Sequence, residues 1–67
     1  MNGQRFLRRA EVEARTGLPR STIYQMISDG QFPKPVRLTP RIVGWIEAEI
    51  DAWSAAKVEE RDHARAS

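Results

Sequence analysis

The sequence predicts a mainly helical domain that carries one small β-hairpin, and three observations support this fold class. Residues 16–30, TGLPRSTIYQMISDG, place a helix stop directly before a helix start and end the second helix with another glycine. Residues 32–45, FPKPVRLTPRIVGW, contain three prolines and are unable to form a helix. Helical periodicity returns over residues 45–57. A chain of 67 residues without cysteine has room for one small core, which supplies about 3–5 kcal/mol of stability.

An extended segment and a short helix come first. Residues 4–8 are expected to form a short strand or an extended arm that makes Phe6 and Leu7 available to the core. Residues 10–16 are expected to form a helix, because glutamates near its start and an arginine near its end complement the helix dipole. Gly17 then ends this helix in the left-handed conformation.

A second helix is predicted over residues 19–28. Pro19 fits the first helical position, where its missing N–H costs nothing. Three apolar residues recur at i, i+3 and i+4 and form one stripe, namely Ile23, Met26 and Ile27. Gly30 is predicted to end the helix with a positive φ, so that the chain turns and Phe32 reaches the core.

The outer face of this second helix carries uncharged hydrogen-bonding groups rather than the Glu and Lys that usually solvate a surface helix. These groups are Ser21, Thr22, Tyr24, Gln25 and Ser28, with Arg20 at the start of the helix. Two helices joined by a tight turn have the layout of a helix-turn-helix, whose second helix lies in the major groove of DNA. An ordinary helical hairpin is the alternative interpretation of this segment.

A basic hairpin is predicted to follow. Residues 36–38 alternate in the manner of a half-buried strand, which directs Val36 and Leu38 inward. Residues 39–41 contain a proline and form the turn, and residues 42–45 return as a second strand. The exposed groups of this hairpin are Arg37, Thr39 and Arg41. A basic hairpin after a helix-turn-helix is typical of a DNA-binding wing, and a plain connecting hairpin with solvated arginines is the alternative.

The last helix is predicted over residues 45–57. Its apolar residues recur at i, i+4 and i+7, namely Ile46, Ile50 and Trp53. Acidic residues crowd its first turns and would be repelled by DNA, so this helix is expected at the back of the domain. Both tryptophans are predicted to be structural. Trp53 is expected to be buried, and Trp45 is the one of the two for which partial exposure is more readily expected, because wing strands are thin. Residues 1–56 are expected to form the domain, and residues 57–67 a charged tail or a helix extension.

The charges are divided unequally along the chain. Residues 1–45 have a formal net charge of +5, and residues 46–67 have a formal net charge of −3. The basic residues of the first part are almost all arginine, whose forked guanidinium matches phosphates and the edge of guanine. This division indicates a polyanionic partner for the first part of the chain, with ordinary scatter of surface charge as the alternative.

Between Thr16 and Trp53 the chain resembles the AlpA-type prophage regulators, which are small winged helix-turn-helix proteins related to excisionases and to MerR-like DNA-binding domains. The resemblance covers about residues 5–54. Its most specific parts are RSTIY at residues 20–24, the FPKPV…VGW stretch at residues 32–45 and EIDAW at residues 49–53. The order and spacing of these parts carry the resemblance, because each part alone is common.

This resemblance implies a winged helix-turn-helix that regulates transcription, often of excision genes. It has a short N-terminal strand or arm, two helices, a hairpin wing and a C-terminal helix. The implied DNA contacts are Arg20, Ser21, Thr22, Tyr24 and Gln25 on the second helix, and Arg37, Thr39 and Arg41 on the wing. Two positions depart from the family pattern, since Pro19 replaces a frequent capping serine and Thr39 replaces a frequent glycine.

The sequence therefore predicts a sequence-specific regulator that binds double-stranded DNA. The alternatives are an excisionase-like factor that bends DNA, and an adaptor that keeps the fold but binds protein. No enzyme activity, cofactor, metal or small-molecule ligand is expected, because the single histidine, His63, lies in the charged tail and no metal-ligand cluster is present. The chain is expected to be cytoplasmic and nucleoid-associated, without membrane contact. It is also expected to dimerise or to bind DNA cooperatively, because one such module buries only about 600–1,000 Å².

Overall fold

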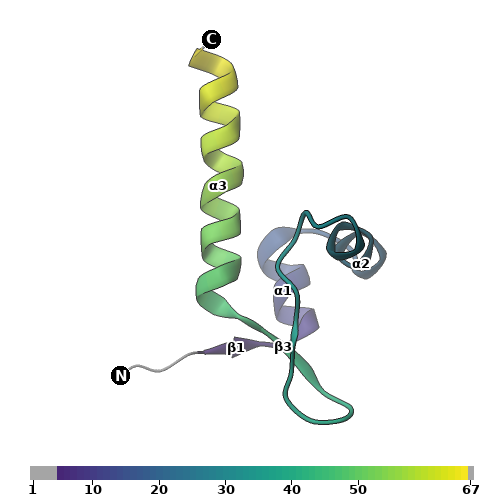
Figure 1. Ribbon diagram of the computed structural model, residues 1–67. Helices are drawn as coiled ribbons and strands as arrows, with labels where there is room; N and C mark the ends of the chain where they lie inside the picture. Colours follow the sequence, from purple (N-terminus) through teal and green to yellow (C-terminus); the bar gives the residue numbers. More distant parts are fainter. Residues whose placement is uncertain (1–4, 67) are drawn as a thin grey trace.

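The computed structural model describes residues 5–66, which form three helices and a small antiparallel sheet (Figure 1). The elements are β1 (Phe6–Leu7), α1 (Arg9–Thr16), α2 (Arg20–Ser28), β2 (Val36–Arg37), β3 (Val43–Ile46) and α3 (Glu47–Ala66). The strand order is β1-β3-β2, so β3 lies at the centre of the sheet. This arrangement confirms the predicted mainly helical fold with a small hairpin and is compatible with a winged helix-turn-helix. Gln4, predicted to begin the first strand, and Ser67 lie outside the described residues.

Strands β1 and β2 are shorter than the predicted residues 4–8 and 36–38. The predicted boundaries of α1, α2 and β3 are wrong by one residue, and local contacts explain these shifts. Helix α1 begins at Arg9, one residue early, because the carboxylate of Glu11 accepts a hydrogen bond from the Arg8 backbone N–H at 3.0 Å. Helix α2 begins at Arg20, since Pro19 is the N-cap in an extended conformation with ψ of 162°. Strand β3 continues to Ile46, because this residue pairs with β1, and α3 follows directly.

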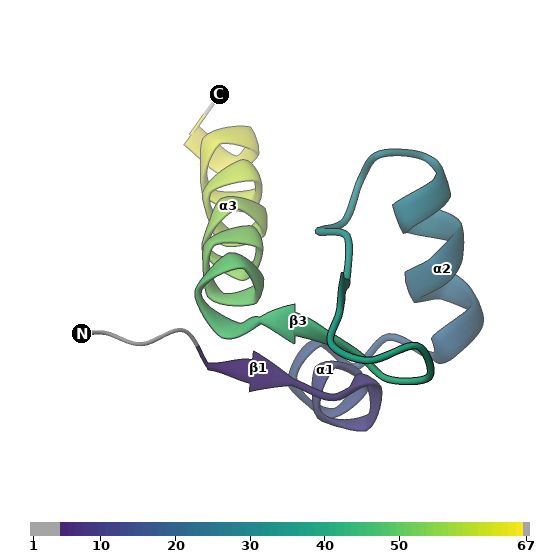
Figure 2. The same cartoon turned by 60° about the horizontal axis from the view of Figure 1, so that its bottom comes forward.

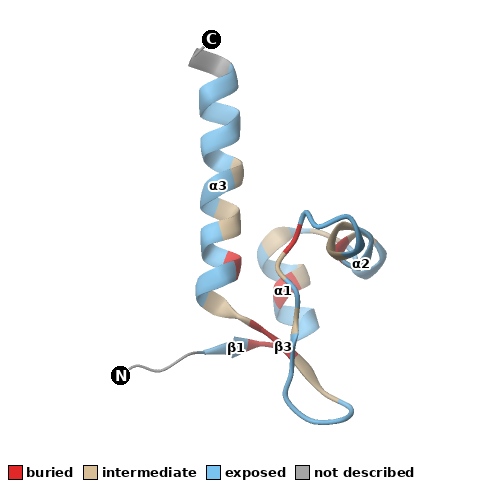
Figure 3. Ribbon diagram, viewed as in Figure 1, coloured by how far each residue is buried: buried red, intermediate tan, exposed pale blue. Residues whose placement is uncertain are grey.

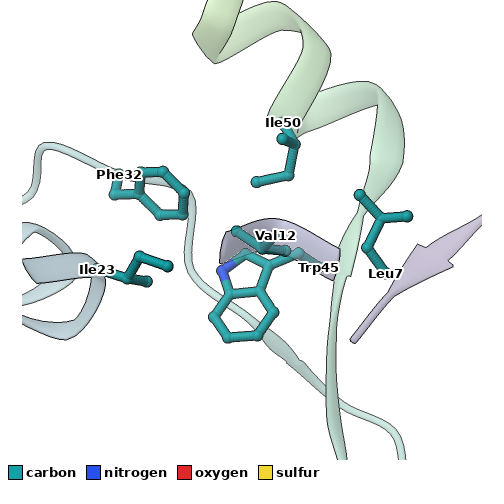
Figure 4. Close-up of a cluster of buried hydrophobic side chains, with 6 residues drawn as sticks. All are labelled: Leu7, Val12, Ile23, Phe32, Trp45 and Ile50. Carbon is teal, nitrogen blue, oxygen red and sulfur yellow. The ribbon is translucent and has the colours of Figure 1, made fainter. Parts of the chain in front are cut away.

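The core lies on one face of the sheet, under the helices (Figures 3 and 4). Its buried side chains are Leu7, Val12, Ile23, Phe32, Trp45 and Ile50. They come from β1, α1, α2, the loop after α2, β3 and α3, so every element except β2 contributes. Figure 4 shows Trp45 in the middle of this cluster, and its indole N–H donates to the carbonyl of Pro33 at 3.0 Å.

The opposite face of the sheet carries partly exposed apolar side chains, which contradicts three inward assignments. Residues that pair directly in an antiparallel sheet lie on the same face, and Val36 pairs with Gly44 whereas Phe6 pairs with Ile46. Phe6 is 39% exposed and Val36 37%, and Leu38 is 40% exposed. The predicted inward direction of Phe6, Val36 and Leu38 is therefore wrong. The sheet residues that face the helices are Leu7, Val43 and Trp45.

The two tryptophans differ from their predicted order of burial. Trp45 is fully buried on the central strand, whereas Trp53 is only partly buried at the rim of the core. The Trp53 ring packs edge-on against Phe32 at 4.8 Å between centroids, and its N–H donates to the Gln31 carbonyl at 2.8 Å. The Lys57 ammonium lies over the same ring, 5.7 Å from its centroid, so Trp53 is covered by α3 itself as well as by the core.

Helix α3 is longer than predicted and runs through almost the whole segment for which the sequence predicts a tail or a helix extension. Its first part packs on the core through Ile50 and Trp53, and its second part projects away from the other elements (Figure 1). The projecting part carries its own ion pairs, Lys57 with Glu60 at 3.4 Å and Arg61 with Asp62 at 3.0 Å. None of the helices within residues 5–66 has the length and apolar character needed to cross a membrane.

Helix α2 ends at Gly30, as predicted. Gly30 has φ of 74° and follows Asp29, which keeps right-handed helical geometry. The N–H of Gly30 donates to the carbonyl of Ile27 at 3.1 Å, and the N–H of Gln31 donates to the carbonyl of Met26 at 2.7 Å. These two bonds form a Schellman motif, which satisfies the last carbonyls of the helix and directs the chain toward Phe32.

Substitutions at Gly30 are expected to test this turn. A Cβ added at Gly30 would meet nothing within 4 Å, so backbone strain alone sets the cost. Gly30→Ala is expected to lower the free energy of unfolding by about 1 kcal/mol, and Gly30→Val by more, because β-branching disfavours positive φ. Gly30→Asn is expected to be nearly neutral. Thermal melts of the three variants check this order, and an alanine variant as stable as the parent would contradict it.

Candidate nucleic-acid interface

The predicted contact face of α2 is open to solvent. Ser21 and Gln25 are exposed on this face, while Thr22 beside them is half-buried. Tyr24 is 38% exposed and lies on the flank of α2 that turns toward the wing. The opposite side of α2 carries Ile23, which is fully buried. The sequence therefore predicted correctly which side of this helix is buried and which is exposed.

The start of α2 is polar and has no side-chain cap. Proline at the N-cap has no side-chain oxygen that could accept from the first backbone N–H groups, which α-helices leave without an intrahelical partner. The Arg20 guanidinium lies over the Tyr24 ring at 5.7 Å from its centroid. This cation–π contact holds the positive charge on the exposed side of the helix, one turn before Tyr24.

Gln25 has a partner within its own helix. Its side-chain amide donates to both carboxylate oxygens of Asp29, each at 3.3 Å. Both residues are exposed and the bonds are long, so solvent competes with them. The amide of Gln25 is thus oriented along the helix surface without being removed from it.

The hairpin between β2 and β3 forms the wing, residues 36–46, and its tip is closed by Thr39. The Thr39 hydroxyl oxygen accepts hydrogen bonds from the N–H groups of Arg41 at 3.2 Å and Ile42 at 3.0 Å. Arg37 donates from its guanidinium to the Pro40 carbonyl at 3.1 Å. Thr39 therefore fixes the turn at a position where the resembling family often has glycine, and Arg37 is anchored on the wing itself.

The cations divide into paired and unpaired sets by location. On the side of α3, Arg15 pairs with Glu47 at 2.6 Å and with Asp51 at 3.4 Å. Among residues 5–64, five Lys and Arg side chains have no carboxylate within 4.0 Å of their charged nitrogens, namely Arg8, Arg20, Lys34, Arg37 and Arg41. All five lie outside α3. Their charged groups are free of ion pairs and available to an anion, whereas Glu47 and Asp51 of α3 are paired with Arg15 of α1.

Helix α2 and the wing lie on the side of the domain away from α3 (Figures 1 and 2). Between them is a hollow of about 410 Å³, lined by Arg8, Arg9, Ala10, Tyr24, Arg41, Ile42 and Val43. Tyr24 of α2 and Arg41 of the wing belong to separate elements, and both line this hollow. Ser21 and Gln25 of α2 and Arg37 of β2 are not among the residues that line this hollow.

Arg8 and Arg9 belong to this surface and were not singled out from the sequence. Pairing of Leu7 with Trp45 brings the start of α1 beside the residues that precede Trp45 on β3. That proximity depends on the pairing register of two strands that are distant in the sequence, which a local sequence pattern does not predict. The sequence signal that was present is the pair of adjacent arginines before the acidic residues of α1.

Nothing in the described residues resembles a metal centre, since no group of three His, Cys, Asp or Glu side chains lies together within them. His63 is exposed on the projecting part of α3. The surface gathered around α2 and the wing is thus one of arginine, hydroxyl and amide groups, which suits recognition of phosphates and base edges.

Known proteins resemble this chain over most of its length. Residues 5–58 match the family model of the prophage CP4-57 regulatory protein AlpA. The uncharacterized protein ORF88 of Enterobacteria phage P4 is 46% identical over 55 residues, which cover 82% of this chain and 62% of the phage protein. The DNA-binding transcriptional activator AlpA of Escherichia coli (strain K12) is 46% identical over 55 residues, covering 73% of this chain and 79% of that protein. The chain therefore belongs to the AlpA family of prophage regulatory proteins.

Proposed function

We propose that this protein binds double-stranded DNA as a sequence-specific regulator of transcription. Helix α2 lies in the major groove with its N-terminal residues on base edges, and the wing contacts the backbone or the minor groove. The base-reading groups are Arg20, Ser21, Thr22, Tyr24 and Gln25, and the wing groups are Arg37, Thr39 and Arg41.

The observation that carries this proposal is the distribution of unpaired cations. Arg20, Arg37 and Arg41 flank an exposed helix face of uncharged polar groups, and none of the three has a carboxylate within 4.0 Å among residues 5–64. A protein-binding groove would instead expose apolar anchors at this place. The relative named a DNA-binding transcriptional activator supports the same function.

Alanine substitutions on the wing are expected to weaken all DNA binding. If Arg37 and Arg41 contact phosphates, each change lowers affinity for any sequence and reduces the slope of log K against log salt by about one unit. Fluorescence anisotropy with a labelled duplex, repeated over a salt series, measures both quantities. Arg61→Ala is the matched control, because it removes the same charge from the projecting part of α3.

Changes at Ser21 or Gln25 are expected to act differently. They lower the preference for the binding site over mixed-sequence DNA and leave the salt slope nearly unchanged, because these groups face bases rather than phosphates. The binding site is first selected from a random duplex library. A parent protein without measurable DNA affinity would contradict the proposal and favour the adaptor, and a strong bend in the selected duplex would favour the architectural role.

A further inference from the structure

The hollow between α1, α2 and the wing presents more positive charge than the two DNA-reading elements alone would supply. Three of its lining residues are arginines, from two places in the chain that the fold brings together. Arg8 precedes α1, Arg9 opens α1, and Arg41 lies in the wing turn. Tyr24 of α2 lines the same hollow and adds an aromatic wall with a hydroxyl group.

We propose that this hollow holds one backbone phosphate of the bound duplex, clamped between Arg8 and Arg41. The inference rests on the proposed function and assigns a phosphate contact to the start of α1, which neither α2 nor the wing provides. Guanidinium groups bind phosphate through forked N–H donors, and two of them on one anion fix its position more strictly than one. The phosphate held in this way would lie between the part of the DNA that α2 contacts and the part that the wing contacts.

The charge state of the hollow supports an anionic occupant. Among residues 5–64, no carboxylate lies within 4.0 Å of the guanidinium of Arg8 or Arg41, so neither guanidinium is held in an ion pair in the protein alone. The Glu11 carboxylate near Arg8 accepts from the Arg8 backbone N–H instead. Both residues are exposed, which leaves their guanidinium groups accessible. Positive groups gathered around one concavity repel one another, and an entering anion relieves this repulsion.

Arg9 has a different position in this site, because a carboxylate already compensates it. Its Nε lies 3.0 Å from the Glu13 carboxylate, one turn along α1, and both side chains are partly exposed. An exposed pair of this kind is weak, so a phosphate competes with Glu13 for the guanidinium. Glu13 therefore acts as an internal competitor that lowers the affinity of the hollow for DNA.

The Arg20–Tyr24 contact connects this hollow with the base-reading side of α2. Tyr24 lines the hollow, and its ring carries the Arg20 guanidinium at 5.7 Å from the centroid. A phosphate in the hollow would therefore lie next to the first turn of α2. Holding that phosphate sets how far the first turn enters the major groove, since phosphate contacts fix the register of a protein on the duplex.

Arg8→Ala and Arg8→Lys, compared with Arg61→Ala, test the clamp. Binding is measured by anisotropy on a mixed-sequence duplex about two helical turns long, over a salt series. Arg8→Ala is expected to reduce the salt slope by about one unit and the affinity at low salt about tenfold. Arg8→Lys is expected to keep the slope, because the charge stays, and Arg61→Ala is expected to match the parent.

Glu13→Gln and Glu59→Gln form the second test, which requires no loss of a binding group. Glu59 lies on the projecting part of α3, so its replacement changes net charge equally but far from the hollow. Glu13→Gln is expected to raise the affinity and to steepen the salt slope more than Glu59→Gln does, because Arg9 is released. If a thermal melt shows that Arg8→Ala is destabilised, the comparison of Glu13→Gln with Glu59→Gln decides whether the hollow binds a phosphate.

Two results would overturn the inference. If the parent shows a salt-dependent affinity but Arg8→Ala and Arg61→Ala leave the same slope, the clamp is absent while the proposed function stands. If Glu13→Gln and Glu59→Gln change the affinity and the salt slope equally, Arg9 does not contact the phosphate, and the proposed function still stands. If the parent itself does not bind the duplex, the proposed function is wrong, and the clamp is wrong with it.

Discussion

Trp45→Ala is expected to leave the protein largely unfolded at room temperature. The Trp45 side chain is 0% exposed and lies in the middle of the core, between residues of α1, α2 and α3. Truncation of a buried tryptophan costs about 3–5 kcal/mol, which equals the whole stability of about 3–5 kcal/mol expected for a chain of this size. Far-UV circular dichroism during heating checks this result, since the variant should show no cooperative transition.

Two further variants separate the causes of this loss. Trp45→Phe keeps an aromatic ring but removes the N–H that donates to the Pro33 carbonyl, so it is expected to melt cooperatively at a lower temperature. Trp53→Ala removes a partly buried ring and is expected to cost less than Trp45→Ala. A Trp53→Ala variant less stable than Trp45→Ala would show that the burial order of the two rings is wrong.

Gly44→Val is expected to destabilise the domain by about 1–3 kcal/mol through overpacking. Gly44 is buried on the central strand, and a Cβ at this position would lie 2.9 Å from Leu38 Cδ1 and 3.2 Å from Phe6 Cβ. The Leu38 methyl can move, but Phe6 Cβ is fixed to the backbone of β1. Gly44→Ala is expected to cost less, because it adds one atom. Urea denaturation of both variants measures the difference.

Leu38→Ala provides the control for this clash. Leu38 is 40% exposed, so its truncation alone is expected to change stability little. In the Gly44→Val background the same truncation removes the nearest contact and is expected to recover part of the lost stability, which a double-mutant cycle measures. Strict additivity of the two changes would contradict the proposed clash.

Local patterns were sufficient to place α1 and α2 to within one residue, whereas α3 continues well beyond its predicted end at residue 57. The stripe that contains Ile23 predicted which side of α2 is buried, and the positive φ of Gly30 was predicted from its position after the stripe. Both features depend on neighbours within one or two turns, which the sequence displays directly. Pro19 was misplaced by one position, because a fixed φ suits both the first helical residue and the residue before it.

The sheet was less predictable, because its faces are set by pairing between distant segments. Alternation in residues 36–38 indicates a strand but does not say which of its two faces meets the core. Pairing of Phe6 with Ile46 and of Val36 with Gly44 decides that, and it leaves both Phe6 and Val36 outside. The same register places Arg8 near the wing, which is why the site was predicted on α2 and the wing but not on α1.

The separation of paired and unpaired charges gives the molecule an electric dipole directed from α3 toward the wing. Residues 46–67, which hold α3, have a formal net charge of −3, and residues 1–45 have +5. Near a polyanion such a dipole turns the molecule before contact, so that more of the first collisions occur with the basic side forward. The association rate constant therefore depends on ionic strength through orientation as well as attraction, and added salt slows arrival by weakening both.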